Sequence, residues 1–195
     1  MTDLFDEPDH ATPLTEEEKA ALIPADITFR RDLNQAEHSN IERGQDWAFR
    51  ARRRELLSEG FNVGLHAHLF GDVWRWAGRF RTTERNLGMP HHQIPMAVRH
   101  LVADARAWVE HRAYSTDELA VRVHHRLVLI HPFVNGNGRH ARLMADLLVM
   151  RLGGERFTWG SANLQDDGEV RRRYIAALQA ADQHDYAPLL AFARS

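Results

Sequence analysis

Twelve consecutive residues, beginning with His131 and ending with Arg142, contain the side chains best suited to chemistry in this chain. The imidazole of His131 is the group that most readily accepts a proton near neutral pH. Gly136 and Gly138 predict a loop with unusual backbone angles that can approach a ligand closely. Arg139 and Arg142 are three residues apart, so they share a helical face and can both reach phosphate oxygens. This combination predicts a site of phosphoryl or nucleotidyl transfer.

The elements around this run predict how it is positioned. It lies between two apolar helical patterns, residues 119–130 and 143–152, and is therefore expected to be a loop that opens a helix. The first amides of a helix have no acceptors within it, and the helix dipole favours negative charge there. An anion-binding helix start next to a histidine is the expected geometry.

The whole chain sets broad limits. Its 195 residues fit one domain, and a formal charge of −2 gives no overall attraction to nucleic acid or anionic membranes. Cysteine is absent, which excludes disulfides and thiolate chemistry. There is no signal-peptide pattern and no apolar run long enough to span a bilayer, so we expect a cytoplasmic protein.

Apolar residues recur every three or four positions over most of the chain, which predicts helices. A capped short helix is expected after Thr15, and the others cover 32–58 (with a break near Gly44), 61–76, 96–111, 115–130, 138–152, 167–181 and 186–193. Residues 80–95 lack this period and are rich in turn formers, which predicts a short β-hairpin. The prediction is an all-α bundle with one small hairpin. An N-terminal arm and short helix (1–26) would precede the domain (27–195).

The run from His131 resembles the signature of the Fic family, His-x-Phe-x-Asp/Glu-Gly-Asn-Gly-Arg-x-x-Arg. It departs from that signature at Asn135, where the family has an acidic residue. Residues 69–81 are similar to the segment that precedes the family's substrate-binding flap. The likeness runs from about Ile27 to the C-terminus, and the layout resembles the short Fic proteins called mobile mystery protein B.

The resemblance implies an enzyme that moves AMP from ATP onto a serine, threonine or tyrosine hydroxyl of a target protein. His131 would remove the hydroxyl proton as the oxygen attacks the α-phosphorus, and Arg142 would grip the terminal phosphate. The loop amides and the Asn137 side chain would hold the phosphates. The residues assigned to nucleotide binding are Asn135, Gly136, Asn137, Gly138, Arg139 and Arg142.

The resemblance also implies a magnesium ion at Asn135. Magnesium prefers carboxylate and phosphate oxygens, and an asparagine carbonyl supplies an oxygen without charge. We therefore expect the Mg²⁺ ion to be held mainly by the nucleotide. The alternative is a slow, metal-poor or inactive enzyme.

A flap over residues 81–95 is expected to pair with an extended segment of the target. Its candidate target-binding residues are Arg81, Thr82, Thr83, Met89 and Ile94. The alternative is an ordinary surface hairpin.

Some Fic proteins are restrained by a helix that carries Ser/Thr-x-x-x-Glu-Gly/Asn. The nearest match here is residues 38–43, on a candidate inhibitory helix near 32–45, and it makes Glu42 the expected partner of Arg142. The alternative is a solvated carboxylate on a helix surface.

Two other functions remain open. One keeps the site but uses another nucleotide donor or removes AMP. The other is an inactive regulatory module of a toxin–antitoxin-like system with a small helix-turn-helix partner. The protein could form oligomers under either function.

Neighbouring histidine pairs, among them His91 and His92, lack the spacing that puts two imidazoles on one helix face, which favours structural or surface roles.

Overall fold

Helices form the regular secondary structure of residues 14–50, 55–161 and 168–195, which are the residues described by a computed structural model. The arm predicted at the N-terminus lies mostly outside these ranges. The helices are α1 (Glu16–Lys19), α2 (Arg30–Arg50), α3 (Glu59–Phe70), α4 (Ile94–Glu110), α5 (Thr116–Ile130), α6 (Asn137–Arg151), α7 (Glu169–Asp182) and α8 (Ala187–Ala193), with short 3₁₀ turns η1 (His91–Gln93) and η2 (Trp159–Ser161). No helix in the described part is long and apolar enough to cross a membrane.

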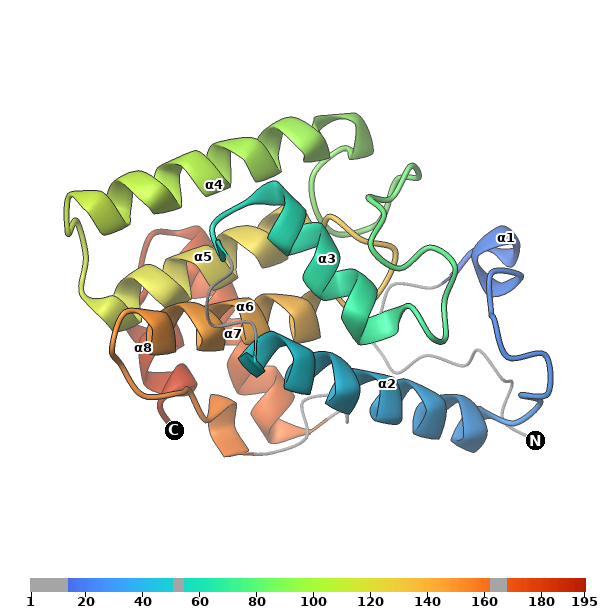
Figure 1. The fold of residues 1–195 in the computed structure, drawn as a ribbon. Helices are drawn as coiled ribbons and strands as arrows, with labels where there is room; N and C mark the ends of the chain where they lie inside the picture. Colours follow the sequence, from blue (N-terminus) through green and yellow to red (C-terminus); the bar gives the residue numbers. More distant parts are fainter. Residues whose placement is uncertain (1–13, 51–54, 162–167) are drawn as a thin grey trace.

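The centre of the fold is the pair α5 and α6, joined by the loop that starts at His131 (Figure 1). Helix α4 packs on α5, and α3 packs on α6. Helix α2 packs on α3 and also reaches α6, while α7 and α8 pair with each other and α8 contacts α5. The central loop is therefore held by helices from both halves of the chain.

Local sequence signals account for several helix ends. Thr15 and Glu18 form a reciprocal capping box at α1, and Ser115 caps α5 through the Glu118 amide. The predicted break at Gly44 is wrong, because α2 continues through it. A Cβ atom at Gly44 would lie 2.6 Å from the carbonyl oxygen of His68, so the glycine permits the close crossing of α2 and α3.

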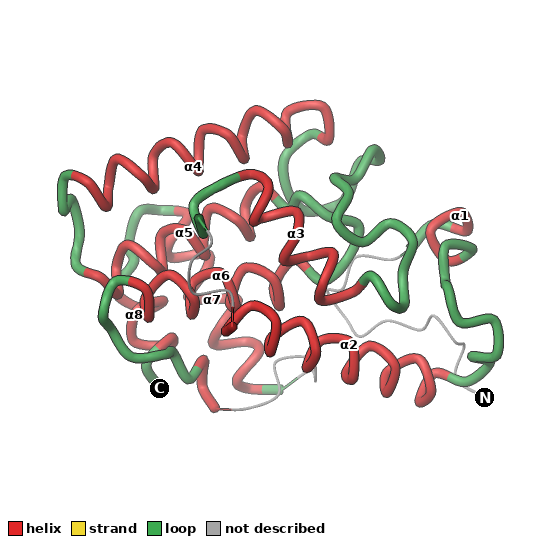
Figure 2. The backbone as a smooth tube through the Cα atoms, in the orientation of Figure 1, coloured by secondary structure: helices red, strands yellow, loops and turns green. Residues whose placement is uncertain are grey.

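The β-hairpin predicted for residues 80–95 is wrong. Figure 2 shows residues 80–90 as a loop, followed by η1 and the start of α4, and the described residues contain no strand there. The backbone amide of Arg81 donates to the Pro132 carbonyl (2.9 Å), and the Met89 amide donates to the Ile130 carbonyl (3.3 Å). Groups that would pair across a hairpin are instead bound to the end of α5 and to the central loop.

Three histidines, His66, His124 and His140, are almost completely buried in the core. Burial lowers the pKa of His124 to about 3 and that of His140 to about 4. The pKa of His66 is also well below its usual value, first because of burial and then because of His140. All three are therefore neutral at pH 7.

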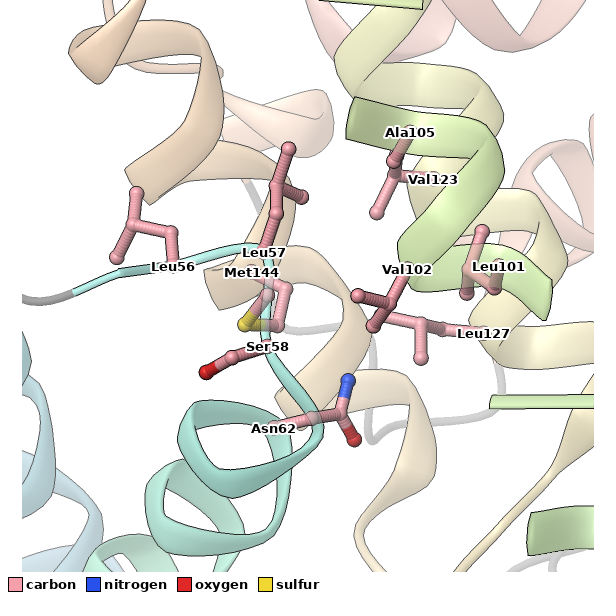
Figure 3. A pocket seen from close by; sticks show the side chains of 10 residues that line it. All are labelled: Leu56, Leu57, Ser58, Asn62, Leu101, Val102, Ala105, Val123, Leu127 and Met144. Atoms are coloured by element: carbon pink, nitrogen blue, oxygen red, sulfur yellow. The ribbon is translucent and has the colours of Figure 1, made fainter. Parts of the chain in front are cut away.

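A cavity of about 10 Å³ lies between α3, α4, α5 and α6 (Figure 3). That volume is close to the minimum for one water molecule, and nearly all of the lining is apolar. No residue of the central loop lines the cavity, so it is not part of the candidate site.

We expect the folded state to lose stability as the pH falls from 6.5 towards 4. The unfolded chain binds protons at these histidines below about pH 6.5, whereas in the folded chain His140 does not bind one until about pH 4 and His124 until about pH 3. At pH 5, His124 and His140 should each lower the free energy of unfolding by about 2 kcal/mol. Urea denaturation at pH 7 and pH 5 measures this loss.

Protonation of carboxylates also lowers the stability of the folded state in acid, so a variant is needed to assign the loss to a histidine. His140→Gln should unfold more easily at pH 7 but show a shallower decline between pH 6.5 and pH 5. A slope equal to that of the wild type would exclude His140 as a source of the acid sensitivity.

Candidate active site

His131 ends α5 in a left-handed conformation, with φ 52° and ψ 60°. Its backbone amide still donates to the Leu127 carbonyl (3.0 Å), so the residue belongs to the helix and also turns the chain out of it. Histidine is one of the few residues other than glycine found in this region with some frequency. The imidazole is thereby fixed at the junction of a rigid helix and the loop.

The loop after His131 is clamped by Asn137. Its side-chain oxygen accepts from the Phe133 amide and its side-chain nitrogen donates to the Phe133 carbonyl, both at 2.9 Å. The Asn137 side chain is buried and points into the loop. The expectation that this side chain holds phosphates is therefore wrong; it sets the shape of the loop, and only its backbone amide remains a candidate.

His66 supports the same loop from α3. Its Nδ1 atom accepts from the Gly78 amide (3.0 Å), so the proton lies on Nε2, which donates to the Asn135 carbonyl (3.0 Å). The His66 ring also stacks on Phe133 at 3.7 Å. This neutral tautomer has both nitrogens occupied and serves the loop, not a metal.

The start of α6 has the geometry of an anion site. Gly136 caps the helix with φ 77°, and a Cβ atom there would lie 2.4 Å from the ring of Phe70, so glycine is required. The amides of residues 137–139 occupy the first helical turn, where N–H groups lack intrahelical acceptors. Gly138 has an ordinary helical backbone, and a Cβ atom there would meet only the Arg142 guanidinium at 3.5 Å. The predicted unusual angle is thus confirmed at Gly136 and wrong at Gly138.

His131 is neutral at pH 7. Burial, followed by the nearby positive charges of Arg81 and Arg85, lowers the pKa of the imidazole to about 4. One ring nitrogen bonds to the Val128 carbonyl, so the other is the basic nitrogen. This is the protonation state that a general base requires.

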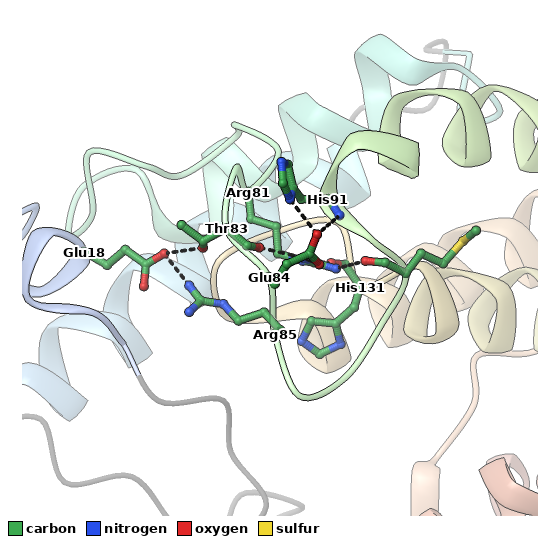
Figure 4. A network of polar contacts seen from close by, with 8 residues as sticks. Glu18, Arg81, Thr83, Glu84, Arg85, His91 and His131 are labelled. Atoms are coloured by element: carbon green, nitrogen blue, oxygen red, sulfur yellow. Dashed lines mark hydrogen bonds and ion pairs between the residues drawn. The ribbon is translucent and has the colours of Figure 1, made fainter.

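Arg81 ties the flap to His131. Its Nε donates to the His131 carbonyl (2.8 Å), while its two terminal nitrogens donate to the carbonyls of Thr83 (2.8 Å) and Met89 (2.5 Å). Figure 4 shows the guanidinium between the two limbs of the flap and the backbone of His131. Gly88, with φ 91°, passes so close that its Cβ would lie 2.4 Å from the Cβ of His131. The flap therefore covers the base directly.

This geometry corrects part of the predicted target-binding set. Arg81 is only 2% exposed and Ile94 is fully buried, so neither can contact a target segment. Met89 is half-buried against the core. Thr82 and Thr83 are exposed, although the Thr83 hydroxyl also reaches Glu18 at 3.3 Å.

The expected partnership of Glu42 and Arg142 is wrong. Glu42 pairs with His38 at 3.3 Å on the outer surface of α2, where 67% of its side chain is exposed. Arg142 instead lies beside Tyr174, with its guanidinium carbon 5.7 Å from the ring centroid and a hydrogen bond between the two side chains.

Sequence reasoning missed Glu37. Its Oε2 atom accepts from Arg139 at 3.0 Å, and its Oε1 atom accepts from the indole of Trp74 at 2.8 Å. Arg139 also lies 4.7 Å over the ring of Phe70. Less than a fifth of the Glu37 side chain is exposed. A carboxylate from α2 thus forms an ion pair with one of the two motif arginines.

The part of the chain that contains the candidate site also matches a known protein family. Residues 57–149, which include the whole central loop, match the model of the Fic/DOC family. The chain belongs to the Fic/DOC family. Its all-α fold with the loop between two central helices is the Fic fold.

The relatives include proteins named protein adenylyltransferase fic-1. The one from Caenorhabditis briggsae is 30% identical over 167 residues, which cover 80% of this chain and 31% of that protein. A solved fragment of Fic-1 from C. elegans has a TM-score of 0.65 at 26% identity, covering 91% of this chain and 52% of that one. The Bartonella tribocorum protein BepC, solved with bound AMPPNP, has the same TM-score at 17% identity, covering 92% and 97%. The chain thus spans about a third of the length of its curated fic-1 relatives.

We expect Arg81→Lys to release the flap from His131. A lysine has one donor nitrogen and cannot reach three carbonyls at once, so the variant should lose about 2 kcal/mol of stability. Hydrogen exchange at residues 82–90 should accelerate, because their anchor is gone. Exchange mass spectrometry and urea denaturation measure both effects.

Arg79→Lys is the matched control, because Arg79 is exposed two residues earlier. It should leave both measurements unchanged. Equal flap exchange in the two variants would show that Arg81 is not the anchor.

Proposed function

We propose that this Fic protein is a protein adenylyltransferase that transfers AMP from ATP to a hydroxyl of a target protein. The observation that carries the proposal is that one loop joins the neutral imidazole of His131 to the first amides of α6, which have no acceptors within the helix. A base and an anion-binding helix start, held on one rigid loop, suit an attack at phosphorus. The names of the relatives support AMP as the transferred group.

In the proposed reaction, the target oxygen forms a bond to the α-phosphorus while the bond to the pyrophosphate oxygen breaks. His131 takes the hydroxyl proton at its free ring nitrogen, which is worth about 10²–10⁴ in rate. The first amides of α6 and the Arg142 guanidinium hold the phosphates and stabilise the charge on the leaving pyrophosphate. The products are an AMP ester on the target and pyrophosphate.

Magnesium fits this site only as an ion that arrives with the nucleotide. Asn135 offers one neutral oxygen, and that oxygen already accepts from the Gly136 amide at 2.6 Å. Because no negative charge is added here, the phosphates themselves would supply most of the ligands. The mechanism above therefore includes no step that depends on a protein-held metal.

ATP labelled at the α-phosphate tests the activity. Wild-type protein should transfer α-label to protein hydroxyls, and His131→Ala should reduce that transfer by at least a hundredfold because the base is lost. ATP labelled at the γ-phosphate is the control and should transfer nothing. Transfer of γ-label would make the protein a kinase, and equal transfer by His131→Ala would remove the base from the mechanism.

We further propose that Glu37 restrains the site. An ion pair between Glu37 and Arg139 keeps one guanidinium of the phosphate site on α2, where it is unavailable to the nucleotide. Trp74 holds the other carboxylate oxygen, so the acceptor is fixed in place.

Glu37→Gln should therefore increase AMP transfer several-fold. The amide oxygen can still accept from Trp74, but the ion pair with Arg139 is lost. Glu42→Gln on the same helix is the matched control and should leave the rate unchanged, since Glu42 is exposed and pairs with exposed His38. If Glu37→Gln lowers stability without raising the rate of AMP transfer, the Glu37 carboxylate stabilises the fold and does not inhibit the enzyme.

A further inference from the structure

A second cluster of metal-ligating side chains lies on the outer side of the flap. Glu84, His91 and His92 each bring one ligand atom to within 4.8 Å of the other two. In the described part of the chain, no other group of three histidine, aspartate or glutamate side chains meets this spacing. The central loop with His131 contributes nothing to the cluster.

We propose that Glu84, His91 and His92 form a binding site for a divalent transition-metal ion of the zinc type. Two imidazole nitrogens and one carboxylate oxygen are a donor set that zinc accepts in proteins. Tetrahedral zinc with ligands at about 2.1 Å places its ligand atoms about 3.4 Å apart. His91 Nδ1 and Glu84 Oε1 are 2.8 Å apart, so a small movement of exposed side chains would complete this geometry.

The backbone brings the three ligands together from different places. His91 and His92 lie on η1, directly before α4, whose first residue Ile94 is fully buried and anchors this end of the helix. Glu84 comes from the opposite limb of the flap. The two imidazole planes are nearly perpendicular (89°), with centroids 5.8 Å apart, so the rings do not stack face to face.

The Glu84 carboxylate is also oriented by a contact with Arg81. Glu84 Oε2 lies 4.0 Å from the buried guanidinium of Arg81, while Oε1 faces His91. Metal-binding carboxylates are commonly held by such outer partners. One oxygen of Glu84 would bind the ion and the other would keep its contact with Arg81, as the arrangement in Figure 4 allows.

An ion at this position would connect the two limbs of the flap, the second of which leads into α4. Arg81 already bonds to the His131 carbonyl, so Glu84, Arg81 and the catalytic histidine form one chain of contacts. Metal binding would therefore hold the flap in its position over His131. The site is distinct from any magnesium carried by a nucleotide, since Mg²⁺ favours oxygen ligands over imidazole.

Calorimetric titration of the untagged full chain with zinc chloride tests the site. The wild type should bind zinc with an affinity at least tenfold higher than His92→Ala. His92 is exposed, so its removal should leave the fold intact. His100→Ala, which removes an exposed histidine of α4, is the matched control and should bind as the wild type does. Equal affinity in the two variants would overturn the proposal.

Two further measurements examine the same site without using AMP transfer. Cobalt chloride should give the strong visible absorption of a four-coordinate Co²⁺ ion with the wild type and His100→Ala, and this absorption should be lost in Glu84→Gln. Zinc should also slow hydrogen exchange at residues 82–90 in the wild type but not in His92→Ala. Unchanged exchange in the zinc-loaded wild type would overturn the link to the flap.

Discussion

The end of α5 imposes the constraint on which the site depends. A helix leaves its last carbonyls without intrahelical donors, and a buried carbonyl without a donor is costly. Here the flap supplies the donors: the carbonyls of Ile130, His131 and Pro132 accept from the Met89 amide, the Arg81 guanidinium and the Arg81 amide. The same bonds that complete α5 place the flap over His131. Flap position and helix termination are therefore one structural feature, which explains why this segment is a bound loop and not a free hairpin.

The shape of the central loop is set by neutral polar groups inside the core. Asn137 clamps Phe133 from within the loop, and His66 bonds to the Asn135 carbonyl from α3. Because burial keeps His66 uncharged, it can accept from one amide and donate to one carbonyl without placing a charge in the core. A loop fixed in this way keeps the first amides of α6 aimed in one direction before any ligand binds, which is the preorganisation that electrostatic catalysis requires.

Much of the fold followed from the sequence because helical periodicity and capping are local. Helices α4 to α8 and the motif loop were predicted to within two residues, as at Ser115 and the start of α6, whereas α2 and α3 end earlier than predicted. The flap was not predicted, because its donors bind a segment about fifty residues away, which no local pattern records. Glu37 was missed for a different reason. The buried positions Leu33, Asn40, Gly44 and Ala48 define the inner face of α2, and Glu37 falls on that face while Glu42 does not. The spacing of the buried residues of α2 therefore indicates Glu37, whereas the match to the inhibitory-helix motif indicated Glu42.

The two motif arginines are controlled by different parts of the protein, although they share one face of α6. Arg139 is held by Glu37 from α2, and Arg142 is held by Tyr174 from α7. Tyr174 also bonds to buried His124 on α5, so Arg142 is fixed to the central core. The position of Arg139 depends on α2. This helix is bound to α3 and the residues after it through hydrogen bonds of the Asn40 side chain. A displacement of α2 would therefore release Arg139 while Arg142 stays in place. The proposed phosphate site thus has one arginine fixed to the core and one whose position depends on a peripheral helix, so it could be controlled without any change in the loop that carries His131.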